Sequence, residues 1–395
     1  MDRTDPFSPF FLADGPSASQ MYGAGMAWGE SPAAWALAHP AFLQEQARRF
    51  ADAGVHGLLL PTLRSNAPAL ASWDLSPRAD ELNEGLARLG AEAVGPLPVG
   101  GRLGPTGLAF DPENPESFDA IYHAYRAQVR ALQRGGASFL LAERLASLAD
   151  MRAAVLAARR SGLPVCVTVT PPASPGDGPS FLTSLIVLQA MGVPAVGVDG
   201  VPFETAEGLL RESFPHAQAR LAARLPVTPA LTPAVFARQE GALAALGAAV
   251  LGAGSGARPE YDEAAAAFVT EVAPTPGPKA DCRAAASAFE AFFLGGDIEL
   301  SEPLPCTMHL VDDLIEAERS GATAALVCVE TMDDAMLLAG LGALARMPIA
   351  VYTESVPVLE AALRYFQGRL LVDTSSPLEE EAVSPVAAKY GALLY

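Results

Sequence analysis

The sequence predicts an α/β fold: an N-terminal TIM-type (β/α)8 barrel followed by a partial C-terminal α/β unit. Three observations lead to this prediction. Alanine-rich amphipathic helices alternate with short apolar runs, and glycine or proline separates the two over the first part of the chain. The apolar runs lack polar alternation, as expected of parallel strands that are covered on both faces. A doubly wound open sheet ranks second, because no G-x-G-x-x-G sequence follows the first strand.

The repeating units can be placed in order along the chain, and their number favours an eight-stranded barrel. The predicted helices cover residues 40–53, 117–134, 148–160, 182–191, 219–225 and 232–246. The predicted strands that follow them cover residues 57–60, 138–143, 164–170, 195–198, 226–227 and 248–252. Most of these helices end at a glycine or proline, the residues that typically stop a helix.

A proline-rich segment divides the chain into two parts. We assign residues 1–272 to the barrel, 273–280 to a linker and 281–395 to the smaller unit, because three prolines fall within residues 273–278. The smaller unit is expected to begin with a helix over residues 281–293. Its predicted strands are 324–329, 348–352, 370–372 and 392–395. So few strands cannot close an eight-stranded barrel, so we expect either a half-barrel or a unit that needs a partner.

The composition of the chain argues against some classes of binding partner and indicates the compartment. The chain has 26 Lys and Arg against 45 Asp and Glu, a formal net charge of −19, which argues against nucleic acid and anionic membranes. No uninterrupted apolar stretch is long enough to span a membrane, and residues 1–5 do not form a basic leader. The four cysteines form no C-x-x-C pair, which is typical of buried thiols in a reducing compartment. We therefore expect a cytoplasmic protein.

Several segments of the first part, taken together, resemble one enzyme family. Residues 12–19 are similar to its L-x-D-G-x-x-G-T strand end, and residues 100–107 to its A-G-S-I-G-P loop. Residues 40–63 resemble its next helix and strand, and residues 125–132 with Glu143 give the closest match. The chain thus resembles the homocysteine S-methyltransferase barrel, in the arrangement found at the N-terminus of cobalamin-dependent methionine synthases.

The second part resembles the beginning of the folate-binding, or pterin-binding, barrel that follows in methionine synthases. The similar segments are residues 348–351, 358–363, 367–368 and 389–392. Tyr352 and Asp373 stand where that family has the Asp and Asn of its pterin site, and Leu326 and Cys328 also replace pterin-binding residues. Each unpaired partner would cost about 1–3 kcal/mol. We therefore do not predict folate binding.

The resemblance also implies a zinc ion that holds the substrate thiol as a thiolate through three cysteines. In this sequence Gly200 stands at the first ligand position, and Gly254 and Ser255 stand at the other two. The four cysteines of the chain, Cys166, Cys282, Cys306 and Cys328, fall at none of these positions. Zinc is expected for the family, but its ligands are absent here, so we predict no metal site.

Two carboxylates of the family site are kept. Asp14 and Glu143 match the residues that contact the amino group of the amino-acid substrate, and Thr168 and Thr170 are expected at the same barrel mouth. The alternatives are a turn role for Asp14 and an ion pair with Arg144 or Arg102 for Glu143.

A glycine-rich loop closes the barrel segment. Gly252, Gly254 and Gly256 form either an anion-binding loop or a plain tight turn. Both interpretations remain open at this point.

These observations favour a diverged homocysteine S-methyltransferase-like protein that keeps an amino-acid-binding mouth but lacks the zinc–thiolate site. Its ligand would belong to the homocysteine or methionine class, and it would act as a pseudoenzyme or with altered chemistry. One alternative is an interaction or scaffold subunit, whose C-terminal half pairs with a second copy or with a corrinoid or folate-domain protein. Another is an active methyltransferase with a different substrate or a displaced metal.

Overall fold

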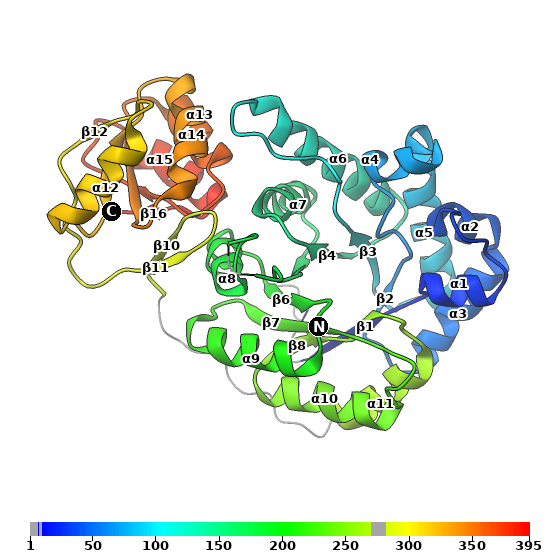
Figure 1. The fold of residues 1–395 in the computed structure, drawn as a ribbon. Helices are drawn as coiled ribbons and strands as arrows, with labels where there is room; N and C mark the ends of the chain where they lie inside the picture. The colour runs from blue at the N-terminus through cyan, green and yellow to red at the C-terminus, as the bar shows by residue number, and fades with distance from the viewer. Residues whose placement is uncertain (1–6, 8–9, 175, 270–281) are drawn as a thin grey trace.

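The computed structural model describes residues 7, 10–174, 176–269 and 282–395. These residues form a larger N-terminal body and a smaller C-terminal body (Figure 1). The predicted linker, residues 273–280, and the N-terminal residues 1–5 lie outside the described residues. Within the described ranges, no helix has both the length and the apolar character that crossing a membrane requires.

The larger body is a closed barrel of eight parallel strands, which confirms the predicted fold class. Each strand pairs with the next one along the chain, and β8 returns to β1 with Phe11 opposite Val250. The strands are β1 (Phe11–Asp14), β2 (Gly57–Leu59), β3 (Val99–Leu103), β4 (Phe139–Leu145), β5 (Val165–Val169), β6 (Ala195–Asp199), β7 (Arg220–Pro226) and β8 (Ala248–Leu251). A short additional strand, β9 (Ala253–Ser255), pairs with the end of β7.

Helices surround the barrel on its outside (Figure 1). They are α1 (Ala18–Gly23), α2 (Pro32–Ala38), α3 (Pro40–Asp52), α4 (Ala67–Leu70), α5 (Ala79–Val94), α6 (Pro115–Arg134), α7 (Leu148–Ser161), α8 (Phe181–Ala190), α9 (Phe203–Ser213), α10 (Pro233–Ala245) and α11 (Pro259–Val269). Local sequence fixes several of their ends. In α7, for example, the Ser147 side chain accepts a hydrogen bond from the backbone N–H of Asp150, and Gly162 ends the helix at a φ of +75°.

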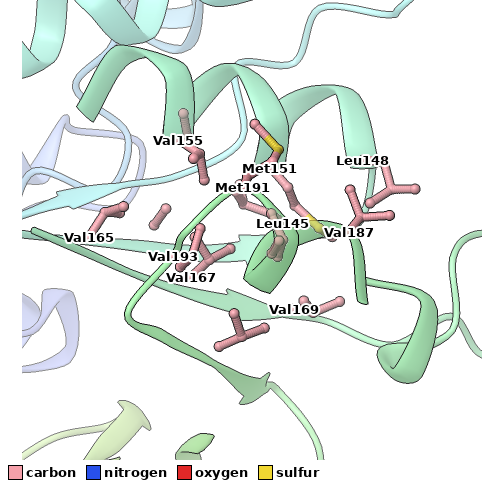
Figure 2. Close-up of a cluster of buried hydrophobic side chains, with 14 of the residues drawn as sticks. Leu145, Leu148, Met151, Val155, Val165, Val167, Val169, Val187, Met191 and Val193 are labelled. Carbon is pink, nitrogen blue, oxygen red and sulfur yellow. The ribbon is translucent and has the colours of Figure 1, made fainter. Parts of the chain in front are cut away.

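Strand alternation divides the core into an outer and an inner layer. Val165, Val167 and Val169 of β5 face outward and pack with side chains of α7 and α8 (Figure 2). Cys166, between them, belongs to a separate cluster inside the barrel together with Phe11 and Phe139. Successive side chains of a strand point to opposite faces, so the inward residues near the strand ends are the ones available to build a site.

Small residues make room for this inner cluster. The rings of Phe11 and Phe139 meet edge to face with their centroids 5.1 Å apart. A Cβ atom at Gly100 would lie 2.3 Å from the Phe139 ring, so the glycine of β3 is required by close packing. The barrel interior is therefore a packed core below its mouth.

The smaller body is built around a parallel sheet of five strands in sequential order. These are β12 (Leu304–Pro305), β13 (Ala325–Cys328), β14 (Ile349–Tyr352), β15 (Leu371–Val372) and β16 (Leu393–Leu394). The connecting helices are α12 (Leu310–Ser320), α13 (Met332–Leu341), α14 (Val356–Tyr365) and α15 (Glu380–Tyr390). Successive helices of this unit contact one another, α12 with α13, α13 with α14 and α14 with α15, as in half of a barrel. The predicted partial α/β unit is confirmed, and its likeness to a pterin-binding domain stays a prediction.

Two predicted helices are wrong. Residues 281–293 contain the hairpin of β10 (Ala284–Ala286) and β11 (Ala291–Phe293). Ser287 and Glu290 form its turn, because the Ser287 N–H donates to the Glu290 carbonyl oxygen and the Glu290 N–H donates to the Ser287 hydroxyl. Burial of the three alanines of β10 overrides their helix preference. In the segment 219–225, residues 220–225 belong to β7, and the preceding α-helix is α9. Two arginines gave this strand the appearance of an amphipathic helix.

The two bodies are joined through a buried arginine. Arg152 of α7 is fully buried and donates hydrogen bonds to the carbonyl oxygens of Leu363 at 2.6 Å, Phe366 at 2.5 Å and Arg364 at 3.1 Å. Burial lowers the pKa of Arg152 to about 10, so the guanidinium remains charged at neutral pH. A cation at the C-terminal end of α14 satisfies carbonyls that have no partner within the helix.

We predict that Arg152→Met lowers the free energy of unfolding by about 3 kcal/mol, because it leaves carbonyl oxygens buried without a donor. Urea unfolding measures this loss, and amide hydrogen exchange is expected to accelerate in α14. Arg160→Met, at an exposed position of the same helix, should change stability by less than about 0.5 kcal/mol. Equal effects of the two substitutions would contradict the capping role.

Candidate functional site

Charged side chains meet inside the barrel at the carboxyl ends of the strands. Asp14 is the last residue of β1, Glu143 lies in β4 and Arg224 lies in β7. All three are completely or almost completely buried. Charges at this depth are stable only when they are paired, so their partners decide what the site can do.

Arg224 is the centre of this arrangement. Its Nη2 lies 3.3 Å from Oδ1 of Asp14, and its Nε lies 3.5 Å from Oε2 of Glu143. Its guanidinium also donates to the carbonyl oxygens of Ala13 and Ala253. The paired carboxylates raise the pKa of Arg224 although burial opposes this, so the side chain stays charged.

Glu143 has a second arginine partner. Nε and Nη2 of Arg102, from β3, both lie 2.5 Å from Oε1 of Glu143. The interpretation of Glu143 as the partner of Arg102 is therefore confirmed. Asp14 and Glu143 are thus already neutralised by arginines of the chain itself.

The predicted threonines serve another carboxylate. Oγ1 of Thr168 and Oγ1 of Thr170 each donate to Asp199, the last residue of β6, at 2.6 Å. The backbone N–H of Arg144 donates to the same carboxylate, also at 2.6 Å. Burial and the charge of Glu143 raise the pKa of Asp199 against these hydrogen bonds. Asp199 therefore holds the ends of β4, β5 and β6 together.

The glycine-rich loop binds one of the chain's own carboxylates. The backbone N–H of Ala253 donates to Oδ2 of Asp14 at 2.6 Å. A Cβ atom at Gly252 would lie 2.6 Å from the carbonyl oxygen of Ala13 and 2.7 Å from Nη1 of Arg224, and its φ is +142°. The sequence left an anion-binding loop or a plain tight turn open for Gly252, Gly254 and Gly256. In the structure this part of the loop binds an anion of the chain itself, the Asp14 side chain.

A cavity of about 500 Å³ opens above these ion pairs. Arg102, Arg144 and Gly254 line it, whereas Asp14, Glu143, Thr168 and Thr170 are not among its lining residues. The expected carboxylates thus do not line the cavity, whereas Arg102, the ion-pair partner of Glu143, does. Its volume falls in the range of small-molecule sites, about 300–1,000 Å³.

The three expected zinc-ligand positions do not fit a zinc ion. Gly200 has a φ of +70°, which a cysteine rarely adopts. A Cβ atom at Gly254 would lie 2.7 Å from the carbonyl oxygen of Arg224, so this backbone cannot carry a cysteine without shifting. Ser255 offers only a hydroxyl group, and zinc prefers thiolate, imidazole or carboxylate.

The four cysteines are also too scattered to form a three-cysteine zinc site together with Cys166. Cys166 lies inside the barrel, where burial raises its pKa to about 12, whereas the other three belong to the smaller body. Within the described ranges, no cluster of at least three His, Cys, Asp or Glu residues is arranged to hold a metal.

The altered pterin positions lie at the carboxyl end of the second sheet. The Tyr352 hydroxyl, at the end of β14, donates to Oε1 of Glu354 at 3.1 Å. Asp373 follows β15 and accepts hydrogen bonds from the backbone and hydroxyl of Ser375 at 2.9 and 2.8 Å. Both side chains are engaged locally, and the absence of folate binding stays a prediction.

Two buried carboxylates were not predicted from the sequence. Glu240 of α10 and Asp262 of α11 are completely buried, and neither carboxylate accepts a hydrogen bond of standard geometry from the described residues. Burial raises the pKa of both well above its ordinary value. The burial of Glu240 could have been predicted from helical spacing, because Glu240 follows Phe236 by four residues and thus lies on the apolar face of its helix.

A scan of protein families matches residues 12–269 to the homocysteine S-methyltransferase model. The match covers more than half of the chain, so this protein belongs to the homocysteine S-methyltransferase family. The family is zinc-dependent in general.

Solved structures give the same fold. The oxidised form of the homocysteine methyltransferase MmuM from Escherichia coli has 19% sequence identity and a TM-score of 0.56, covering 65% of this chain and 95% of that one. Its metallated form has 19% identity and a TM-score of 0.55, covering 67% and 99%. At this identity the likeness establishes the fold alone.

We predict that Glu240→Gln raises stability at neutral and alkaline pH. A raised pKa in the folded protein means that folding takes up a proton, so stability is lost as the pH rises above the ordinary value of 4.5 toward the folded pKa. The substitution should add about 1–3 kcal/mol at pH 8 and much less near pH 4, which urea unfolding at several pH values measures.

Asp150→Asn is the matched control, because Asp150 is buried but accepts hydrogen bonds from Tyr125 at 2.7 Å and Thr106 at 3.0 Å. It should lose stability. A uniform loss across the pH range for Glu240→Gln would show that Glu240 is charged and paired.

Proposed function

We propose that this chain is a diverged member of the homocysteine S-methyltransferase family that binds a small amino-acid-like ligand at the barrel mouth without a zinc-held thiolate. The observation that carries the proposal is the backbone at Gly200 and Gly254, which disfavours cysteine at both positions. A free thiol has a pKa near 8.5, so without a metal little thiolate exists at neutral pH.

A second observation concerns what stands in place of the metal. Nη2 of Arg144 donates to the carbonyl oxygen of Gly254 at 3.3 Å, at one of the three expected ligand positions. A guanidinium is a permanent cation with no lone pair to offer a metal. This arrangement supports a mouth that recognises a ligand by charge and shape.

Under this proposal the kept carboxylates act mainly through the arginines. The resemblance predicts that Asp14 and Glu143 contact the ammonium of the ligand. Arg224 and Arg102 already balance the charges of Asp14 and Glu143. The two carboxylates would therefore hold the arginines in position and attract an ammonium only weakly. Their contribution is thus positioning rather than chemistry.

The test measures zinc in the purified chain and its thermal stability with methionine, with homocysteine and without ligand. We expect substoichiometric zinc and a higher Tm with at least one of the two amino acids, because binding to the folded state alone stabilises it. The Escherichia coli MmuM protein, which has a metallated form, is the positive control for zinc loading. One tightly held zinc per chain together with methyl transfer to homocysteine would overturn the proposal.

The sheet of the smaller body supports a second candidate, an interaction subunit. Among the described strands, β12 and β16 each have a neighbour on one side only, and an open edge can pair with another chain. Light scattering at micromolar concentration, alone and with a corrinoid or folate-domain protein, tests this candidate. A dimer of the chain or a complex with the added protein is expected. A chain that stays strictly monomeric, both alone and with the added protein, would contradict this candidate.

A further inference from the structure

Three neighbouring strands each bring one arginine to the same cavity. Arg64 follows β2, Arg102 lies in β3 and Arg144 lies in β4, and all three line the mouth. Glu30 is the single carboxylate among the lining residues. The chain as a whole has a net charge of −19, so this local excess of positive charge runs against the composition.

Arg144 is held in a conformation that an arginine rarely adopts. Its φ is +60°, where glycine would be free of strain, and its backbone N–H is fixed by Asp199. Its side chain is exposed, forms no salt bridge with a described residue and donates through Nη2 to the carbonyl oxygen of Gly254. Strain that the surrounding structure maintains is typical of functional positions.

Arg64 adds a second guanidinium that has no carboxylate partner among the described residues, and it lies beside an aromatic surface. It is exposed, forms no salt bridge with any described residue, and its Cζ lies 4.5 Å from the centroid of the Trp73 ring. Trp73 is fixed by a 2.5 Å hydrogen bond from its Nε1 to the carbonyl oxygen of Gly29. Tyr22 also lines the cavity, so a flat apolar wall stands next to the cations.

Arg102 differs from the other two. Glu143 balances its charge, so the net positive charge of the cavity comes from Arg64 and Arg144. Two guanidinium groups match the geometry of a carboxylate or phosphate, which accepts paired N–H donors. An ammonium placed between these two guanidiniums would be repelled by them, and a neutral thiol would leave both without a counter-ion.

We propose that the mouth binds the oxyanion of a small organic ligand, a carboxylate or a phosphate, between Arg64 and Arg144, with a planar or apolar portion of the ligand against Trp73 and Tyr22. This inference rests on the proposed ligand-binding function and names the part of the ligand that the site recognises. An amino acid satisfies it through its carboxylate. The size of the cavity also admits larger anions.

The experiment titrates the purified chain with benzoate, phenyl phosphate and benzyl alcohol, followed by tryptophan fluorescence and thermal shift. Benzoate or phenyl phosphate is expected to bind, and uncharged benzyl alcohol is not. Benzoate and phenyl phosphate distinguish the two sources of oxyanion. Arg144→Gly should weaken binding by about tenfold or more, the range expected for losing a charge-assisted hydrogen bond.

Arg144→Gly also separates recognition from a structural role. It keeps the backbone N–H that bonds Asp199 and removes the strain, so the Tm without ligand should stay equal or rise. Arg160→Gln removes an exposed positive charge outside the cavity and should leave binding unchanged. A lower Tm with unchanged affinity would show that Arg144 only ties β4 to the 252–256 loop, and would overturn the inference.

Failure of this inference is distinguishable from failure of the proposed function. Suppose that the zinc-free chain and its Arg144→Gly variant bind methionine or homocysteine equally well, and that neither binds the two aromatic anions. That result would overturn the oxyanion site alone. Stoichiometric zinc with methyl transfer would overturn the proposed function instead.

Discussion

Arg224 places a positive charge inside the barrel, and much of the mouth is arranged around that charge. Removing an ion from water costs several kcal/mol, which only close partners offset. Asp14, Glu143 and the carbonyl oxygens of Ala13 and Ala253 provide these partners. They belong to β1, β4 and β9, so one side chain of β7 links strands far apart in the sequence. Gly252 is needed because any Cβ atom there would meet this guanidinium.

The same ion pairs decide what a ligand can meet. Asp14 and Glu143 are paired and do not line the cavity, so its charged lining groups are three guanidiniums and the carboxylate of Glu30. The expected metal positions are occupied by Gly200, Gly254 and Ser255. The family fold is thus kept, and among the described residues three arginines line its mouth. Because one fold can host many functions, the family fold alone does not fix the chemistry of this mouth.

The repeating units of the barrel could be predicted because helix, glycine and apolar strand are local signals. β7 was missed because Arg220 and Arg224 interrupt its apolar pattern, and only the folded barrel gives Arg224 its buried partners. The pairing of Glu143 with Arg102 was among the alternatives, and both residues lie toward the carboxyl ends of neighbouring strands. The cavity and the conformation of Arg144 depend on side chains from several strands meeting in space, which sequence spacing does not report.

Asp14 and Arg224 stabilise each other inside the barrel, and the arrangement of the mouth depends on this stabilisation. A double-mutant cycle with Asp14→Asn and Arg224→Met, measured by urea unfolding, tests it most directly. Each single change should cost about 3–5 kcal/mol by leaving a buried charge without its partner, and the double change should cost clearly less than their sum, with a coupling on the order of 2 kcal/mol or more. A coupling below about 0.5 kcal/mol would contradict the account, because the two charges would then be independent.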